Sequence, residues 1–275
     1  MDSNSYETIR VRVEAGVAFV TIDHPPINLL DGALIADLAA VVDAAGTDDA
    51  VQVVVFDSAN TDFFIAHADV QSILAMPVER HPRRERLPRF HALVEALRTL
   101  PKLTIGVVAG RARGGGAELV WSMDLRFAAA GRALFGQPEV ALGIIPGGSG
   151  TQRLPHLVGR GRALEMIVGC DDVSGELAEH WGLVNRVLPD AELESFVATL
   201  ASRVARFPAE AVAAAKEAVD AALGDPEAGL LTEADLFNRA WSSGAGHARI
   251  ERFLALGGQT PEVELDLPAV FDDLR

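Results

Sequence analysis

The fold is decided by the stretch Gly110-Arg111-Ala112-Arg113-Gly114-Gly115-Gly116-Ala117-Glu118-Leu119. It follows a short apolar run at residues 104–109, which predicts a buried strand, and it leads into apolar residues that can continue as a buried helix. A strand that turns through glycines into a helix leaves backbone N–H groups free at the helix start, where the helix dipole adds partial positive charge. The stretch therefore predicts an anion or oxyanion site, with the carboxylate of Glu118 just beyond it.

A second carboxylate follows in Phe135-Gly136-Gln137-Pro138-Glu139. Glycine runs alone also fit a tight strand-to-helix crossing in which the glycines serve only packing, and the pattern leaves both interpretations open. A phosphate-binding P-loop is excluded because no Lys follows the glycines, and the glycine spacing differs from the dinucleotide-binding motif.

The composition indicates a globular chain with an acidic surface. The 275 residues are 49% hydrophobic and carry a formal net charge of −15, so we expect one main domain with a smaller appendage. Such a surface repels nucleic acid and anionic lipid, and we expect neither as a general partner. An anionic ligand would need a local basic patch.

Cys170 is the single cysteine, which excludes an internal disulfide and fits a reducing, cytoplasmic compartment. We expect it to be a small buried hydrophobe. Residues 1–5 have neither the basic start nor the apolar core of a signal peptide, and no apolar run is long enough to span a membrane. No His/Cys cluster or closely spaced set of carboxylates suggests a metal site.

Alternating patterns in the first third of the chain predict an α/β fold. Residues 9–14 and 17–22 read as strands, and Leu34, Leu38 and Val41 recur at helical spacing up to a stop at Gly46. The β-branched run at residues 51–56 is typical of a buried parallel strand. Strand, helix and strand at this spacing start an α/β architecture.

Residues 63–101 predict two helices and a local reversal of charge. Asp69 can cap a short helix that Pro77 ends, and apolar residues at 90, 93, 94 and 97 mark an amphipathic helix that ends before Pro101. Residues 79–98 carry six arginines against three glutamates. A solvated helix face and a phosphate-facing patch both account for these arginines.

The rest of the chain continues the α/β pattern and then becomes helical. Strands are expected at residues 124–128, 133–135 and 183–188, with a glycine-rich loop at 144–154 that enters a helix and Ser174 as the cap of another. From Asp190 onward the pattern is helical, and the acidic tail after Gly258 is expected to be extended. This helical end cannot easily bury all its apolar faces alone, so we expect a partner subunit.

Five motifs follow one another in order. They are Pro26-Ile27-Asn28-Leu29-Leu30; Phe64-Ile65-Ala66-His67-Ala68-Asp69; Gly114-Gly115-Gly116-Ala117-Glu118-Leu119; Phe135-Gly136-Gln137-Pro138-Glu139; and Leu142-Gly143-Ile144-Ile145-Pro146-Gly147 through Gly150-Thr151-Gln152-Arg153-Leu154. The set resembles the crotonase superfamily, and most of all the enoyl-CoA hydratases. The resemblance implies a core domain over residues 1–195, built as a spiral of ββα repeats. It also implies a C-terminal helical oligomerisation region over residues 196–275, in homotrimers that often pair into hexamers.

The same resemblance implies an acyl-CoA thioester substrate, with coenzyme A as part of the substrate and no other cofactor. The backbone N–H groups of Ala68 and Gly115 would polarise the thioester carbonyl. Glu118 would hold and activate water for attack at C3, and Glu139 would also hold that water and pass a proton to C2. The remaining implied substrate contacts are Ala66, His67, Asp69, Gly114, Pro138 and Gly147.

Three positions depart from the family pattern. His67 stands where Gly is usual, and Arg113 stands where an apolar residue is usual; either could narrow the acyl pocket or add a polar contact. We expect His67 to be a satisfied loop histidine and Arg113 to be salt-bridged or outward-facing. Residues 253–258 lack the Lys or Arg that many relatives place near a neighbouring subunit's CoA, and arginines of residues 79–98 could compensate.

The possession of both glutamates favours hydration, since isomerases of the family generally rely on the position of Glu139 alone. Two alternatives remain open at this point. One is another crotonase reaction, such as isomerisation or thioester hydrolysis. The other is a CoA-binding or oligomeric scaffold without turnover, which would have no need for both carboxylates.

Overall fold

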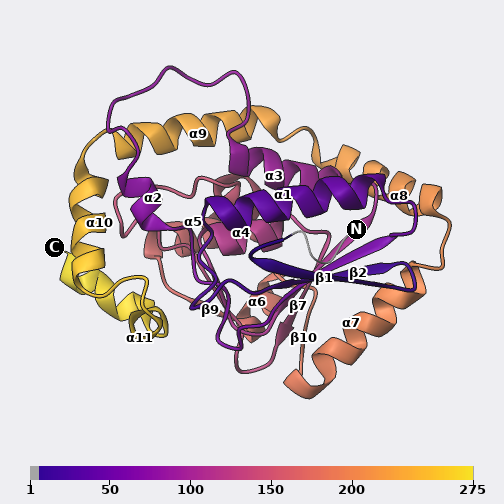
Figure 1. The fold of residues 1–275 in the computed structure, drawn as a ribbon. Helices are drawn as coiled ribbons and strands as arrows, with labels where there is room; N and C mark the ends of the chain where they lie inside the picture. Colours follow the sequence, from indigo (N-terminus) through magenta and orange to yellow (C-terminus); the bar gives the residue numbers. More distant parts are fainter. Residues whose placement is uncertain (1–5, 275) are drawn as a thin grey trace.

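Two sheets with surrounding helices make up the computed structural model, which describes residues 6–274 (Figure 1). The larger sheet has the strand order β1-β2-β3-β5-β7-β10, and the smaller one has β4-β6-β8-β9. Only β1 with β2 and β8 with β9 pair antiparallel among these neighbours. The expectation about a signal peptide concerns residues 1–5, which lie outside the described range.

Seven strands lie within a few residues of their expected positions, and three short ones, β4, β6 and β9, were not expected. The strands are β1 (Ile9–Glu14), β2 (Val17–Ile22), β3 (Val53–Ser58), β4 (Phe63–Ile65), β5 (Leu103–Val108), β6 (Arg111–Arg113), β7 (Leu125–Ala129), β8 (Leu134–Gly136), β9 (Val173–Ser174) and β10 (Arg186–Leu188). The chain passes from the larger to the smaller sheet three times, at β3–β4, β5–β6 and β7–β8. A helix follows each passage, so the expected spiral of ββα repeats is confirmed.

The helices also follow the expected order. They are α1 (Gly32–Thr47), α2 (Val70–Leu74), α3 (Arg89–Thr99), α4 (Gly115–Trp121), α5 (Gly150–Gly169), α6 (Gly175–Trp181), α7 (Asp190–Val204), α8 (Ala209–Leu223), α9 (Glu227–Trp241), α10 (Ala245–Ala255), α11 (Pro261–Glu264) and the 3₁₀ helix η1 (Leu267–Leu274). The expectation of an extended tail was wrong, because α11 and η1 fold back. Residues 258–274 are called the C-terminal strap below.

Alternate residues of the central strand β3 face two different hydrophobic clusters. Val54 and Phe56 belong to the main core with α1, α3 and α4, whereas Val53 and Val55 belong to a second cluster with α7. Successive side chains of a strand point to opposite faces, so a strand covered on both faces is apolar throughout. This explains the continuous β-branched run in the sequence.

Helix α7 runs without interruption past residue 195, where the domain boundary was expected. Its residues Leu193, Val197 and Ala201 pack on the larger sheet, so α7 covers the core. The division into two domains stays a prediction.

The helices after α7 wrap around the rim of the core. Helix α9 lies over α3, and α10 and α11 continue down past α2 (Figure 1). Helix α8 has no buried residue, and its Val219 and Leu223 are 65% and 61% exposed. No helix within residues 6–274 is long and apolar enough to cross a membrane.

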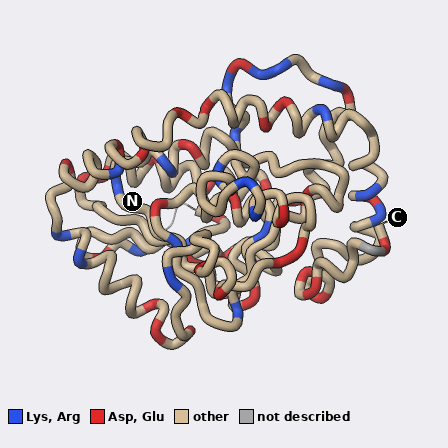
Figure 2. Tube along the Cα trace, turned by 180° about the vertical axis from the view of Figure 1, so that it is seen from behind, with Lys and Arg blue, Asp and Glu red and all other residues tan. Residues whose placement is uncertain are grey.

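Most of the clustered arginines lie in a loop and not on a helix face. Arg80, Arg83, Arg84 and Arg86 are exposed in the segment between α2 and α3, which arches over α9 (Figure 2). The Arg83 guanidinium donates to the Thr232 hydroxyl at 3.0 Å. The interpretation of these arginines as a solvated helix face was therefore wrong for four of the six, because the helix begins only at Arg89.

Candidate active site

Glu118 is a buried carboxylate in the first turn of helix α4. Its side chain is 2% exposed, and its Oε1 accepts hydrogen bonds from the amides of Gly148 (2.9 Å) and Gly150 (2.7 Å). Burial raises the pKa of Glu118 well above its ordinary value, and the negative charges of Glu233 and Glu139 raise it further. The site therefore makes Glu118 a stronger base than an ordinary surface carboxylate.

Glu139 follows strand β8 and faces the turn at Gly114. A Cβ placed on Gly114 would lie 2.7 Å from Oε1 of Glu139. The residue as a whole is half-buried, but its Oε2 is buried and accepts no hydrogen bond from the described residues. Burial raises the pKa of Glu139 to about 7, so this carboxyl can both give and take a proton near neutral pH.

The amides of Ala68 and Gly115 form no hydrogen bond within residues 6–274. Gly115 is the first residue of α4, and Gly114 before it has a φ of 49°, a conformation that favours glycine. A Cβ on Gly114 would lie 3.4 Å from the Cβ of His67, so the Ala68 loop and the glycine turn lie side by side. Free amides beside two buried carboxylates suit a substrate that develops negative charge on oxygen.

Glu233 brings a third buried carboxylate to the same region from helix α9. It accepts hydrogen bonds from the amides of Ser149 (2.6 Å) and Thr151 (2.8 Å) and from Nε2 of His91 (3.0 Å). Glu233 is fully buried and His91 is 2% exposed. The loop whose amides hold Glu118 is thus itself held by a residue of the C-terminal region.

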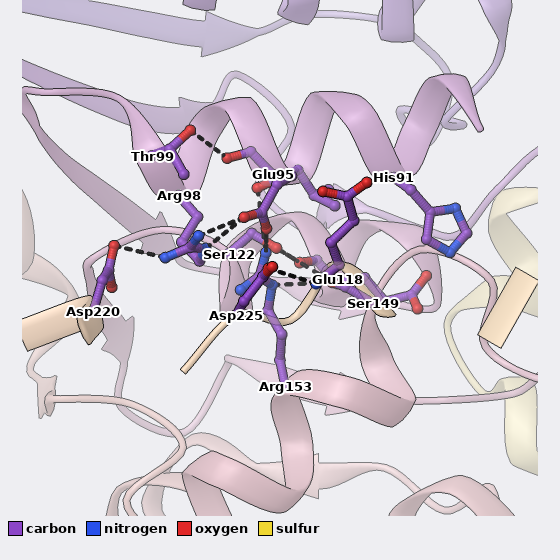
Figure 3. Close-up of polar contacts among 12 residues, drawn as sticks. His91, Glu95, Arg98, Thr99, Glu118, Ser122, Ser149, Arg153, Asp220 and Asp225 are labelled. Atoms are coloured by element: carbon purple, nitrogen blue, oxygen red, sulfur yellow. Dashed lines mark hydrogen bonds and ion pairs between the residues drawn. The ribbon is translucent and has the colours of Figure 1, made fainter. Parts of the chain in front are cut away.

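A polar network continues from this loop to the surface of α3 (Figure 3). The Ser122 hydroxyl donates to the Glu118 carbonyl at 2.7 Å and lies 3.3 Å from the Ser149 hydroxyl. Arg153 donates to that hydroxyl at 3.2 Å and to Glu95 at 3.1 Å. These contacts hold helix α4 at its C-terminal end, where Ser122 follows the last helical residue, whereas the glycine turn lies at its N-terminal end.

Comparison with known proteins decides the family. A model of the enoyl-CoA hydratase/isomerase family matches residues 12–254. The chain belongs to this family. It is 34% identical to a crotonyl-CoA hydratase of Syntrophomonas wolfei, over 87% of this chain and 92% of that one, and 34% identical to a 2,3-dehydroadipyl-CoA hydratase of Escherichia coli, over 86% and 92%. A crystal structure of a provisionally named enoyl-CoA hydratase from Streptomyces avermitilis superposes with a TM-score of 0.90 at 38% identity, covering 98% of this chain and 99% of that one.

The predicted site residues of this enoyl-CoA hydratase/isomerase family member fall into two groups. Ala68, Gly114, Gly115, Glu118 and Glu139 converge, as described above. The others lie around them: Ala66 packs with Ile27 and Phe63, Asp69 caps α2, Pro138 is buried before Glu139, and Gly147 faces the Phe237 ring. The Asp69 carboxylate already accepts from the amides of the α2 start. Contact of these residues with a substrate stays a prediction.

Two of the three departures from the family pattern have partners in the structure. His67 is buried and bonded to the Ala68 carbonyl and to Glu264, so it is satisfied as expected. Arg113 is salt-bridged to Asp172 at 2.5 Å, but it is only 1% exposed and therefore not outward-facing.

Glu233, His91 and Glu264 were not found by the sequence analysis. The helical spacing of His91 with Val94 could have shown that it lies on the buried face of α3. Nothing local could have found the glutamates, because each pairs with a histidine more than a hundred positions away.

Other features do not extend this site. No group of His, Cys, Asp or Glu able to hold a metal occurs in the described part of the chain. Cys170 is buried, as expected. A cavity of about 770 Å³ under α8 is lined by neither Glu118 nor Glu139, and the glycine turn at Gly114 does not line it either.

Proposed function

We propose that this chain adds water across the C2–C3 double bond of an enoyl-CoA thioester. One observation carries the proposal: two buried carboxylates with raised pKa values, Glu118 and Glu139, lie beside the free amides of Ala68 and Gly115. The similarity of this chain to several hydratases also supports the proposed reaction. Because the relatives act on acyl groups as different as crotonyl and dehydroadipyl, the acyl group is left open.

The proposed mechanism divides the work between the amides and the carboxylates. The amides of Ala68 and Gly115 donate to the thioester oxygen, where negative charge grows as water attacks C3. Glu118 takes a proton from the water, and Glu139, which enters the step protonated, holds the same water and delivers its own proton to C2. Proton exchange from Glu118 to Glu139, directly or through water, then restores both carboxyl groups. The hydroxyl group ends on C3 and one hydrogen on C2, with no change of oxidation state overall, so no cofactor beyond the substrate's CoA is needed.

The apolar surface of α8 supports assembly into a homotrimer or a dimer of trimers as part of this proposal. Val219 and Leu223 are exposed in the single chain, and a second subunit would cover them. The single cysteine supports a reducing, cytoplasmic location. The acidic net charge supports a small-molecule substrate over nucleic acid.

The test is loss of the conjugated enoyl absorbance of crotonyl-CoA with the purified protein. Glu118→Gln and Glu139→Gln keep the shape of each side chain and remove its proton chemistry, so each should lower kcat by about 10²–10⁴. Glu179→Gln, an exposed glutamate on α6, is the matched control and should leave kcat unchanged. Turnover that survives both active-site substitutions would contradict the proposal. Binding of CoA without turnover of crotonyl-CoA would favour a different acyl group or a different crotonase reaction.

A further inference from the structure

His67 and Arg113, the two buried residues that depart from the family pattern, share one partner in the C-terminal strap. His67 Nε2 lies 2.9 Å from Oε1 of Glu264, and Arg113 Nη1 donates to the backbone carbonyl of Glu264 at 2.7 Å. Glu264 is itself fully buried. Residues 67 and 113 each stand one position before Ala68 and Gly114, so one strap residue contacts both loops of the site.

His67 and Glu264 form a buried charged pair. Nδ1 of His67 lies 2.7 Å from the Ala68 carbonyl, which can only accept, and Nε2 faces a carboxylate, so both ring nitrogens carry hydrogen. Burial alone would lower the pKa of His67, but Glu264 raises it above its ordinary value. Burial acts to raise the pKa of Glu264, and His67 brings it below its ordinary value.

Backbone contacts with Leu30 set the direction in which the Ala68 amide points, and the His67–Glu264 pair holds the carbonyl of the same residue. The His67 carbonyl accepts from the Leu30 amide at 2.9 Å, and the Asp69 amide donates back to Leu30 at 3.1 Å. In a trans peptide the carbonyl of one residue and the N–H of the next point in opposite directions, so the Ala68 N–H points away from Leu30. The His67 ring then holds the next carbonyl in the loop, and Glu264 holds the ring.

The strap holds the glycine turn through Arg113 in the same way. The Arg113 guanidinium is shared between Asp172 and the Glu264 carbonyl. The strap adds a third contact at Gln259, whose amide group donates to the Asp69 carboxylate at 2.9 Å and whose backbone N–H donates to Glu264 at 2.8 Å.

Apolar packing keeps the strap in place. Its Leu267 and Leu274 are buried in a cluster with Val70 and Ile73 of α2 and with Phe253 of α10. The strap is therefore seated on the helix that follows the Ala68 loop, and its polar contacts do not depend on exposed side chains.

We propose that Glu264 is a positioning residue that aligns the Ala68 and Gly115 amides through His67 and Arg113. The inference rests on the proposed function, in which those amides hold the thioester oxygen. A misaligned donor weakens transition-state stabilisation more than ground-state binding.

The test compares Glu264→Ala and Glu264→Gln with Glu262→Ala, an exposed glutamate on the same short helix. Glu264→Ala should lower kcat for crotonyl-CoA about tenfold, with KM changed less than about threefold. Glu264→Gln keeps an acceptor for His67 and should lie between this variant and the unchanged protein. Deuterium exchange should quicken in peptides covering residues 64–70 and 110–117 in Glu264→Ala, and not in Glu262→Ala.

A double substitution tests whether Glu264 acts through His67. His67→Gln with Glu264→Ala should cost less in kcat than the product of the two single effects, since both remove the same contact. Unchanged kcat in Glu264→Ala would overturn the proposal, even with faster exchange, because the contact would then serve stability alone. If the unmodified protein turns over neither crotonyl-CoA nor 2,3-dehydroadipyl-CoA, the proposed function fails, and exchange in the two peptides alone decides whether the strap holds the loops.

Discussion

Glu233 of helix α9 accepts hydrogen bonds from both the backbone amide and the hydroxyl group of Thr151, at the start of helix α5. The same carboxylate also holds the Ser149 amide. The amides of Gly148 and Gly150, which bind Glu118, lie between and beside these anchors. The loop that binds the Glu118 carboxylate is thus held in place by a second buried glutamate, which comes from a distant helix.

Glu233→Gln should lower kcat for crotonyl-CoA by about tenfold, because the loop that holds Glu118 loses its charged anchor. It should also lower the pKa of Glu118, since removal of a like charge favours ionisation, and so move the acidic limb of the kcat profile to lower pH. Glu227→Gln, exposed on the same helix, should show neither effect. An unshifted profile would mean that Glu233 acts only on stability.

Gly114→Ala should abolish most turnover, because its Cβ would lie 2.7 Å from Oε1 of Glu139. Gly131→Ala separates this crowding from backbone strain. Gly131 also has a positive φ, of 70°, but nothing lies within 4 Å of a Cβ placed there. Both variants should lose some stability by thermal unfolding, and only Gly114→Ala should lose kcat. Equal loss of kcat in the two would point to strain alone.

Glu139→Gln should stabilise the fold at alkaline pH relative to acidic pH. Folding raises the pKa of this carboxyl from 4.5 to about 7, so the folded state binds its proton more tightly. The resulting stabilisation is fully present below pH 4.5 and is lost as pH rises through 7, on the order of 3 kcal/mol in the free energy of unfolding. Glutamine does not titrate, so the free energy of unfolding of the variant should rise relative to that of the unmodified protein between pH 5 and pH 8. Denaturant titrations at each pH measure both. If the free energies of unfolding of the two proteins change with pH in parallel, the pKa of Glu139 is not raised.

Neutralising Arg83, Arg84 and Arg86 together to Gln should weaken CoA binding by about tenfold, since their exposed loop carries a local excess of arginines on an acidic chain. The effect should shrink at high salt, because exposed charges are screened. The control replaces Arg160, Arg203 and Arg206, which are exposed elsewhere and change the net charge equally. Calorimetric affinities that match the unmodified protein would exclude the phosphate-facing interpretation.

The sequence alone predicted the order of the main strands and helices, and it singled out the two glutamates as candidates. Period-two runs become strands and period-3.6 runs become helices because each must bury one face or both, and this rule needs only neighbours in the chain. The turn at Gly114 could be predicted for a similar reason, since a strand that enters a helix through a residue with positive φ favours glycine there. The tail was misjudged because Leu267 and Leu274 become buried only against α2 and α10.

Only the tertiary structure decided what surrounds the glutamates. His91 with Glu233 and His67 with Glu264 are pairs 142 and 197 positions apart, and no local pattern marks either glutamate. A buried charge is tolerated only beside a partner, and which partner is near depends on how the spiral and the C-terminal helices pack. The sequence therefore determined which residues are candidates for the chemistry, and packing decided their pKa values and the contacts that hold them in place.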